Sequence, residues 1–225
     1  NPSTRLQEFD VSLKFPGAPD MTYGWSKLVG EYLAQFVDNV YIFRPFSGYA
    51  WDQDITYPFP MYIKRAVERQ DPFDVWGTGI QTRDFIHMKD VVSAVLTAVR
   101  EGIKGPVNLG TGRATSFINL AKIVCERVGY VPQIKTNPDK PVGCPYRVAN
   151  VNEMLKFYTP KISLEEGIKE AVAREPFLYI SIRPLPVLTP FVEVLDVYVT
   201  PAGKEDVKAK TAVLSGTNLP NLDLA

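Results

Sequence analysis

Helical and strand-like patterns of apolar residues alternate along most of the chain. Apolar residues recur at helical spacing in four segments, which predicts helices over 23–37, 62–70, 88–100 and 116–128. Short apolar runs predict strands at 40–43, 74–76 and 107–109. Ser163 and Glu166 have the spacing of a capping box, which opens one more helix. This alternation predicts an α/β domain with a largely parallel sheet.

Single positions within these helices carry expectations of their own. The first helix is predicted to bury one face, which is formed by Leu28, Val29, Tyr32, Leu33, Phe36 and Val37. Thr115 or Ser116 should cap the helix that follows them, and Asp90 is expected to act as a helix N-cap rather than as an acid catalyst. Cys125 falls on the apolar side of its helix, so it is predicted to lie in the core.

The pattern changes at about residue 176. Three strand-like runs, separated by turns that contain Pro and Gly, follow at 177–182, 192–200 and 206–214. We therefore predict two regions: a partial α/β domain over 1–175 and a small β-rich extension of unknown role over 176–225.

Composition narrows the classes of protein. The 225 residues include 25 basic and 25 acidic side chains, and this balance argues against a nucleic-acid partner. No apolar run is long enough to span a bilayer, so no membrane partner is expected. Cys125 and Cys144 are too few for a disulfide framework and lack the spacing of a metal site. A cytoplasmic protein without a bound metal is the resulting expectation.

Candidate chemistry begins with Tyr23 and Lys27. Because they are four residues apart, the phenol and the ammonium share one face of a helix. A free phenol is a poor base at neutral pH, and a neighbouring cation favours its deprotonated form. The pair could supply a general base, although the same pattern also occurs in amphipathic surface helices.

Four motifs in fixed order extend this observation. Tyr23-Gly24-Trp25-Ser26-Lys27 is followed by Arg44-Pro45-Phe46-Ser47-Gly48-Tyr49, by the stretch 77–87 with its Arg83-Asp84-Phe85-Ile86-His87 end, and by Val107-Asn108-Leu109-Gly110-Thr111-Gly112. Over about residues 1–173 the chain resembles the C-terminal half of the extended short-chain dehydrogenase/reductases. The nearest group is the NAD-dependent nucleotide-sugar epimerases and dehydratases.

The resemblance implies a role for each matching position. Tyr23 would be the base that takes a proton from a sugar hydroxyl, and Lys27 would hold the ribose of NAD. Phe46 would lie near the nicotinamide. Ser47 would contact the substrate, although the family usually has Asn there. His87 would be a structural residue of its turn.

The nucleotide part of the substrate would meet other side chains. Phe59 and Trp76 would pack against the base, and Arg83 and Arg147 would clamp the pyrophosphate. The family commonly has Asp where this chain has Asn150. Simpler roles remain open, because Trp76 could end a strand in the core and Arg83 could pair with Asp84 or Asp90.

The glycine-rich cofactor motif of this family has no match in the sequence. No G-x-x-G-x-x-G segment occurs, and Ser3 and Thr4 lie too near Tyr23 to be the family's catalytic Ser/Thr. With Asn1 in place of an initiator Met, this suggests an incomplete Rossmann-like fold. Three hypotheses follow: an enzyme fragment inactive alone, a non-catalytic nucleotide-sugar-binding scaffold, or an interaction module built on the extension. A missing N-terminal half and a second copy are the candidate protein partners.

Overall fold

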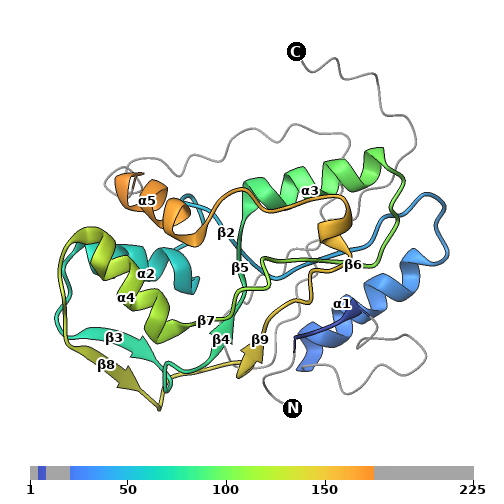
Figure 1. Cartoon of the computed structure of the whole chain (residues 1–225). Helices are drawn as coiled ribbons and strands as arrows, with labels where there is room; N and C mark the ends of the chain where they lie inside the picture. Colours follow the sequence, from blue (N-terminus) through green and yellow to red (C-terminus); the bar gives the residue numbers. More distant parts are fainter. Residues whose placement is uncertain (1–4, 9–20, 175–225) are drawn as a thin grey trace, which may run out of the picture. The chain divides into compact units, whose positions relative to one another are not determined.

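The computed structural model describes residues 5–8 and 21–174 of the chain (Figure 1). Two expectations lie outside these residues: the β-rich extension over 176–225, and the placement of Ser3 and Thr4. The described part has mixed α/β structure with parallel strand pairs, as the alternating pattern predicts.

The chain divides into two compact units. Among the described residues, unit 1 contains 5–7, 44–97 and 108–174, and unit 2 contains 8, 21–43 and 98–107. The boundaries fall within single elements: a strand that begins at Phe43, another that begins at Val107, and the last turn of a helix that ends at Arg100. Each unit is described on its own below.

The strands are short and form several small sheets. They are β1 (Phe43–Pro45), β2 (Ser47–Tyr49), β3 (Phe73–Trp76), β4 (Thr82–Arg83), β5 (Phe85–His87), β6 (Val107–Leu109), β7 (Thr115–Ser116), β8 (Ile134–Asn137) and β9 (Tyr146–Arg147). β1 pairs with β6, β2 with β5 in parallel, and β3 with β8 in parallel, while β4 lies between β7 and β9.

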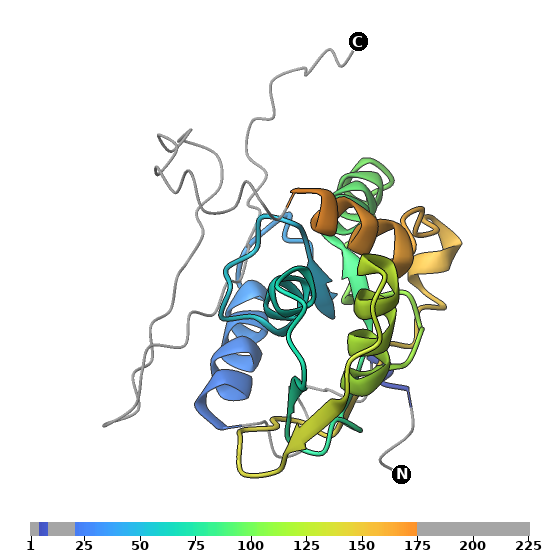
Figure 2. The same ribbon diagram turned by 90° about the vertical axis from the view of Figure 1, so that its left-hand side faces the viewer.

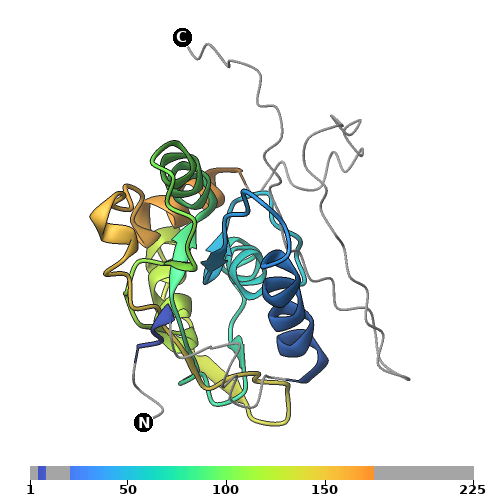
Figure 3. The same ribbon diagram turned by 90° about the vertical axis from the view of Figure 1, so that its right-hand side faces the viewer.

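Most of the described helices belong to unit 1. They are α2 (Pro58–Val67), most of α3 (Met88–Arg100), α4 (Phe117–Val128) and α5 (Leu164–Arg174), together with the short 3-10 turn η2 (Met154–Lys156). Figure 2 shows α2, α4 and α5 as neighbours, and Figure 3 shows η2 beside α3. The buried side chains of α2, α4 and α5 form one aromatic-rich cluster with those of β2, β3 and β5, in which the rings of Tyr49 and Phe59 lie 4.3 Å apart. A Cβ at Gly167 would lie 2.3 Å from the Tyr49 hydroxyl, so glycine lets α5 approach this closely.

Several expectations about single elements are confirmed, and others are wrong. The helix over 88–100 and the strand over 107–109 have the predicted bounds, and Ser116 caps α4 through Asn119 N at 3.2 Å. The strand expected at 40–43 begins instead at Phe43, because the preceding residues form a turn and one isolated bridge. Asp90 does not cap α3: it lies in the first turn and accepts hydrogen bonds from the segment after η2.

Unit 2 contains the helix α1 (Met21–Ala34), two residues of which carry the candidate chemistry. The predicted burial of one whole face is wrong. Leu28 is buried, whereas Val29, Tyr32, Leu33, Phe36 and Val37 are about half exposed or more. The helix also ends three residues earlier than predicted, in turns that follow Ala34.

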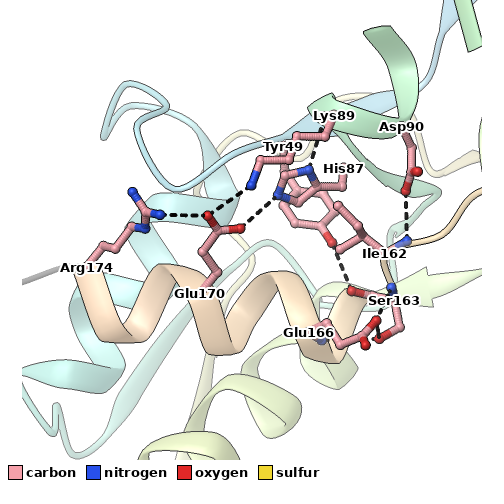
Figure 4. Close-up of polar contacts among 9 residues, drawn as sticks. All are labelled: Tyr49, His87, Lys89, Asp90, Ile162, Ser163, Glu166, Glu170 and Arg174. Carbon is pink, nitrogen blue, oxygen red and sulfur yellow. Dashed lines mark hydrogen bonds and ion pairs between the residues drawn. The ribbon is translucent and has the colours of Figure 1, made fainter. Parts of the chain in front are cut away.

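His87 ends β5 and is buried, with 2% of its surface exposed. Its Nδ1 accepts a hydrogen bond from Lys89 N at 3.1 Å, and its Nε2 lies 3.5 Å from a Glu170 carboxylate oxygen (Figure 4). Glu170 also forms ion pairs with Lys89 and Arg174, and the Tyr49 ring meets the imidazole edge to face. These contacts join α5 to the start of α3 and agree with the structural role expected for the only histidine.

Unfolding experiments should show that His87 makes the fold sensitive to mild acid. Burial lowers the pKa of His87, and the nearby Glu170 opposes that shift. Below a pH of about 6.5 the imidazole therefore takes up a proton more readily in the unfolded state than in the folded state. The free energy of unfolding should fall as the pH drops below that value, by at most about 1.4 kcal/mol per pH unit. Urea unfolding at pH values from 7 to 5.5 measures the slope. His87→Gln should flatten it, and an unchanged slope in this variant would contradict the assignment.

Candidate functional site

A cavity of about 190 Å³ lies in unit 1 between α2, the β3–β4 segment, the start of α4 and the loop before β9. Aromatic, aliphatic and cationic side chains line it. They include Met61, Tyr62, Arg65, Trp76, Gln81, Arg83, Phe117 and Val142. Trp76 and Arg83, which the sequence suggested as substrate-binding residues, therefore both line one cavity.

Trp76 presents its indole to this cavity, and 42% of the residue is exposed. The indole N–H donates to Asp74 Oδ2 at 3.1 Å, and Lys140 Nζ lies 5.5 Å from the centre of the ring. The Asp74 carboxylate in turn lies 3.7 Å from Arg65 Nη2. These contacts hold an aromatic surface in place at the cavity, so Trp76 is not a core residue.

The turn from β3 to β4 explains how the chain brings Trp76 and Arg83 to the same cavity. Gly77 and Gly79 have φ values of +69° and +74°, which glycine adopts without strain. The buried Gln81 closes the turn, because its Nε2 donates to Trp76 O at 2.7 Å. The glycines and Gln81 therefore reverse the chain between the two residues.

Arg83 and Arg147 occupy paired positions on adjacent strands. β4 and β9 run parallel, with Arg83 opposite Arg147 in the register. Burial lowers the pKa of Arg83, and the nearby Arg147 lowers it further. The Arg83 guanidinium also lies 5.6 Å from the centre of the Phe117 ring, so it is stacked on an aromatic face within the cavity.

The two carboxylates suggested as partners of Arg83 have other donors. Asp84 is fully buried and accepts hydrogen bonds from Thr111, Gly112 and Ala149. Asp90 accepts from the segment 158–162. Within residues 5–8 and 21–174, no Asp or Glu lies within ion-pair distance of Arg83, so the alternative of a simple surface salt bridge is wrong there. A neighbouring pair of guanidinium groups is suited to a multiply charged anion.

Other predicted site residues lie elsewhere in unit 1. Phe46 and Ser47 are half-buried at the junction of β1 and β2, where the Phe46 N–H donates to Leu109 O and the Ser47 N–H to Asp84 O, each at 2.9 Å. Phe59 is 2% exposed and belongs to the aromatic core, so it does not line the cavity.

Tyr23 and Lys27 lie one turn apart on α1 of unit 2. The Lys27 ammonium nitrogen is 5.3 Å from the centre of the Tyr23 ring, and 47% of Tyr23 is exposed. Ser26 Oγ donates to Tyr23 O at 2.8 Å, which is a contact within the helix. The structure thus brings the phenol and the ammonium together on one face of α1.

Sequence reasoning missed several residues of the cavity. Met61, Tyr62 and Arg65 lie on α2, and Gln81 lies in the turn before β4. Of these, only Gln81 lies within a motif of the sequence, between Gly79 and Arg83 in the stretch 77–87. Among the described residues, no group of three or more His, Cys, Asp or Glu side chains could hold a metal ion. No described helix has the length and apolar character needed to cross a membrane.

Comparison with known proteins identifies the family. Residues 2–110 match the NAD dependent epimerase/dehydratase family. A dTDP-4-dehydro-6-deoxy-D-allose reductase from Streptomyces bikiniensis is 32% identical over 162 residues, which are 68% of this chain and 49% of the reductase. Over the matched segment, this chain belongs to the NAD dependent epimerase/dehydratase family. The chain spans about half the length of the curated relatives it matches.

Solved structures agree with this family assignment. UDP-glucose 4-epimerase from Thermotoga maritima, solved with UDP-glucose, has a TM-score of 0.59 and 26% identity, covering 68% of this chain and 52% of the epimerase. The dTDP-glucose 4,6-dehydratase of Bacillus anthracis, solved with NAD, has a TM-score of 0.67 at 20% identity, covering 78% and 56%. The latter supports the Rossmann-type fold of this family.

Proposed function

We propose that unit 1 binds the nucleoside diphosphate part of a nucleotide sugar at the cavity lined by Trp76 and Arg83. One observation carries the proposal: Arg83 lies opposite Arg147 and has no carboxylate partner among the described residues, while Trp76 offers an aromatic face at the same cavity. The two guanidinium groups would bind the diphosphate, and the indole would stack on the base.

Relatives support this class of ligand. The Thermotoga maritima epimerase is described with UDP-glucose, and the Streptomyces bikiniensis reductase is named for a dTDP-linked sugar. These ligands share a nucleoside diphosphate and differ in the base. A site that recognises two phosphates and a planar ring fits what they share.

We propose that α1 supplies the proton-transfer groups of the same reaction class. The exposed Tyr23 phenol would take a proton from a sugar hydroxyl, and the Lys27 ammonium lies beside it on the same face of α1. Lys27 would also hold the cofactor ribose, and Phe46 would lie against the nicotinamide. NAD, when bound, would accept the hydride from the sugar carbon. The solved relatives include NAD complexes, which supports this cofactor for the family.

For these 225 residues by themselves, we propose binding without turnover. The sequence has no G-x-x-G-x-x-G segment, which in this family binds the cofactor pyrophosphate.

We propose further that the partial enzyme domain extends to residue 175. The alternative of a non-catalytic nucleotide-sugar-binding protein predicts the same ligand binding, and it differs in predicting no turnover even when a cofactor half is supplied.

Calorimetric titration of the full chain with UDP, dTDP and GDP tests the proposed ligand class. At least one should bind, and Trp76→Ala should weaken it by roughly tenfold or more, since stacking on an aromatic side chain contributes about 1–3 kcal/mol per base. Trp51→Ala is the matched control, because Trp51 packs against Arg174 away from the cavity and should keep the affinity. Failure of all three nucleotides to bind would refute the proposal.

A further inference from the structure

Asp84 is a fully buried carboxylate whose hydrogen bonds all go to backbone or hydroxyl donors far away in the sequence. None of its surface is exposed. Oδ1 accepts from Thr111 N at 2.8 Å and Thr111 Oγ1 at 2.6 Å. Oδ2 accepts from Gly112 N at 2.9 Å and Ala149 N at 3.2 Å. Hydrogen bonds to an ionised acceptor are stronger than neutral ones, so this carboxylate joins three separate segments of unit 1.

These segments lie next to the two arginines. Asp84 directly follows Arg83, and Ala149 lies two residues after Arg147. Thr111 and Gly112 lie in the loop that leads into β7, whose residue Thr115 pairs with Arg83. Because Asp84 directly follows β4, its carboxylate connects β4 to the segments next to its two neighbouring strands, β7 and β9.

The strands themselves supply little rigidity at this place. β7, β4 and β9 have two residues each, so the ladder between Arg83 and Arg147 is short. Short, isolated strand pairs are marginal without additional contacts. Four charge-assisted hydrogen bonds that one carboxylate accepts are a substantial addition to so short a ladder.

We propose that Asp84 is a positioning residue that fixes the spacing between Arg83 and Arg147 for a diphosphate. The proposal rests on the function proposed above. Asp84 acts through the backbone rather than by neutralising charge, because its oxygens accept from Thr111, Gly112 and Ala149 and it forms no ion pair with Arg83 in the described part of the chain.

The chemistry of the site requires a carboxylate of this length. An asparagine would direct its NH2 group at backbone N–H donors, which would break the hydrogen bonds on one side. A Cβ at Gly110 would lie 2.5 Å from Asp84 Oδ2, so the surroundings leave no room for a longer side chain. Asp84→Asn is therefore the informative change, since it keeps the shape and replaces one of the two acceptor oxygens with a donor.

Asp90→Asn provides a matched control. Asp90 is 2% exposed and accepts three hydrogen bonds from Tyr158, Lys161 and Ile162, yet it does not contact the arginine strands. Both variants remove a buried carboxylate that joins distant segments. Loss of stability should therefore be comparable, whereas only Asp84→Asn should affect the spacing of the arginines.

The test compares the affinity of the full chain for UDP, dTDP and GDP with its affinity for uridine, thymidine and guanosine. Asp84→Asn should weaken binding of the diphosphate by roughly tenfold and leave the nucleoside affinity unchanged. The size is taken by analogy with groups that orient metal ligands, whose mutation typically costs about 10–100-fold in metal affinity. Asp90→Asn should change neither. Equal diphosphate affinity in the two variants would overturn the role of Asp84 while leaving the proposed ligand class intact.

Two further outcomes are decisive. If the wild-type chain binds no nucleoside diphosphate, the positioning role fails together with the proposed function. If Asp84→Asn does not fold, Thr111→Val tests the positioning role instead. This variant removes the hydroxyl that donates to Asp84 Oδ1 and keeps the hydrogen bond from Thr111 N. It should weaken diphosphate binding a fewfold relative to Thr111→Ser, and equal affinity of this pair would overturn the proposal.

Discussion

Replacing Arg83 with alanine should weaken the binding of a nucleoside diphosphate by roughly a hundredfold. A hydrogen bond to a charged group contributes about 1.5–3 kcal/mol, and Arg83 can donate more than one to a phosphate. The guanidinium lies over the Phe117 ring and opposite Arg147 in the strand register, so its removal would leave one of the two cations of the proposed anion site. Calorimetric titration of wild type and variant with UDP, dTDP and GDP measures the loss.

Two control variants make this result specific. Arg127→Ala removes an exposed guanidinium from the last turn of α4, outside the cavity, and should bind as wild type does. Arg83→Lys keeps the charge and loses the planar fork, so its affinity should fall between wild type and Arg83→Ala. If Arg83→Ala binds the diphosphate as tightly as Arg127→Ala, the arginine pair is not the anion site.

Replacing Tyr23 with phenylalanine should remove turnover and leave nucleotide binding intact. General-base catalysis contributes about 10²–10⁴-fold to rate, and the phenol is the proton acceptor in the proposed reaction. The measurement requires the chain to be joined to a cofactor-binding half of the family, such as that of the Thermotoga maritima epimerase. Turnover of UDP-glucose and affinity for UDP are then measured on the same joined protein.

Tyr32→Phe is the matched control for this loss. Tyr32 lies on the same helix, is also half exposed, and contacts Phe36 rather than Lys27. The joined Tyr32→Phe protein should turn over substrate at the rate of the joined wild type. Equal turnover by the Tyr23→Phe and Tyr32→Phe proteins would show that Tyr23 is not the base. If the joined wild type binds UDP but does not turn over UDP-glucose, the result would favour the alternative of a non-catalytic nucleotide-sugar-binding protein.

Periodic patterns predicted some elements well, because buried apolar residues recur along them at regular spacing. The apolar residues of α3 and β6 follow the helical and buried-strand patterns, and both elements have the predicted bounds. The capping box at Ser163 is confirmed, since Ser163 N donates to Glu166 Oε2 and Glu166 N to Ser163 Oγ. Local chemistry determines these features, so the sequence alone is sufficient for them.

Features that depend on distant contacts could not be read from spacing. β4, β7 and β9 have two residues each, too few to show any period, and the register of Arg83 with Arg147 joins positions 64 residues apart. Asp90 has the residue type of an N-cap, yet its donors come from the segment after η2. The family resemblance suggested a shared role for the two arginines, but their placement on neighbouring strands became visible only in the structure.

The indole N–H of Trp76 offers the most direct test of ligand binding at this cavity. It donates to Asp74 and should give one resolved nitrogen–proton resonance, which a Trp76→Phe variant assigns. Titration with UDP, dTDP or GDP should shift this resonance while that of Trp51, which packs on Arg174, stays in place. Absence of binding up to millimolar nucleotide, or binding that leaves the Trp76 resonance unmoved, would contradict the proposed nucleoside diphosphate site.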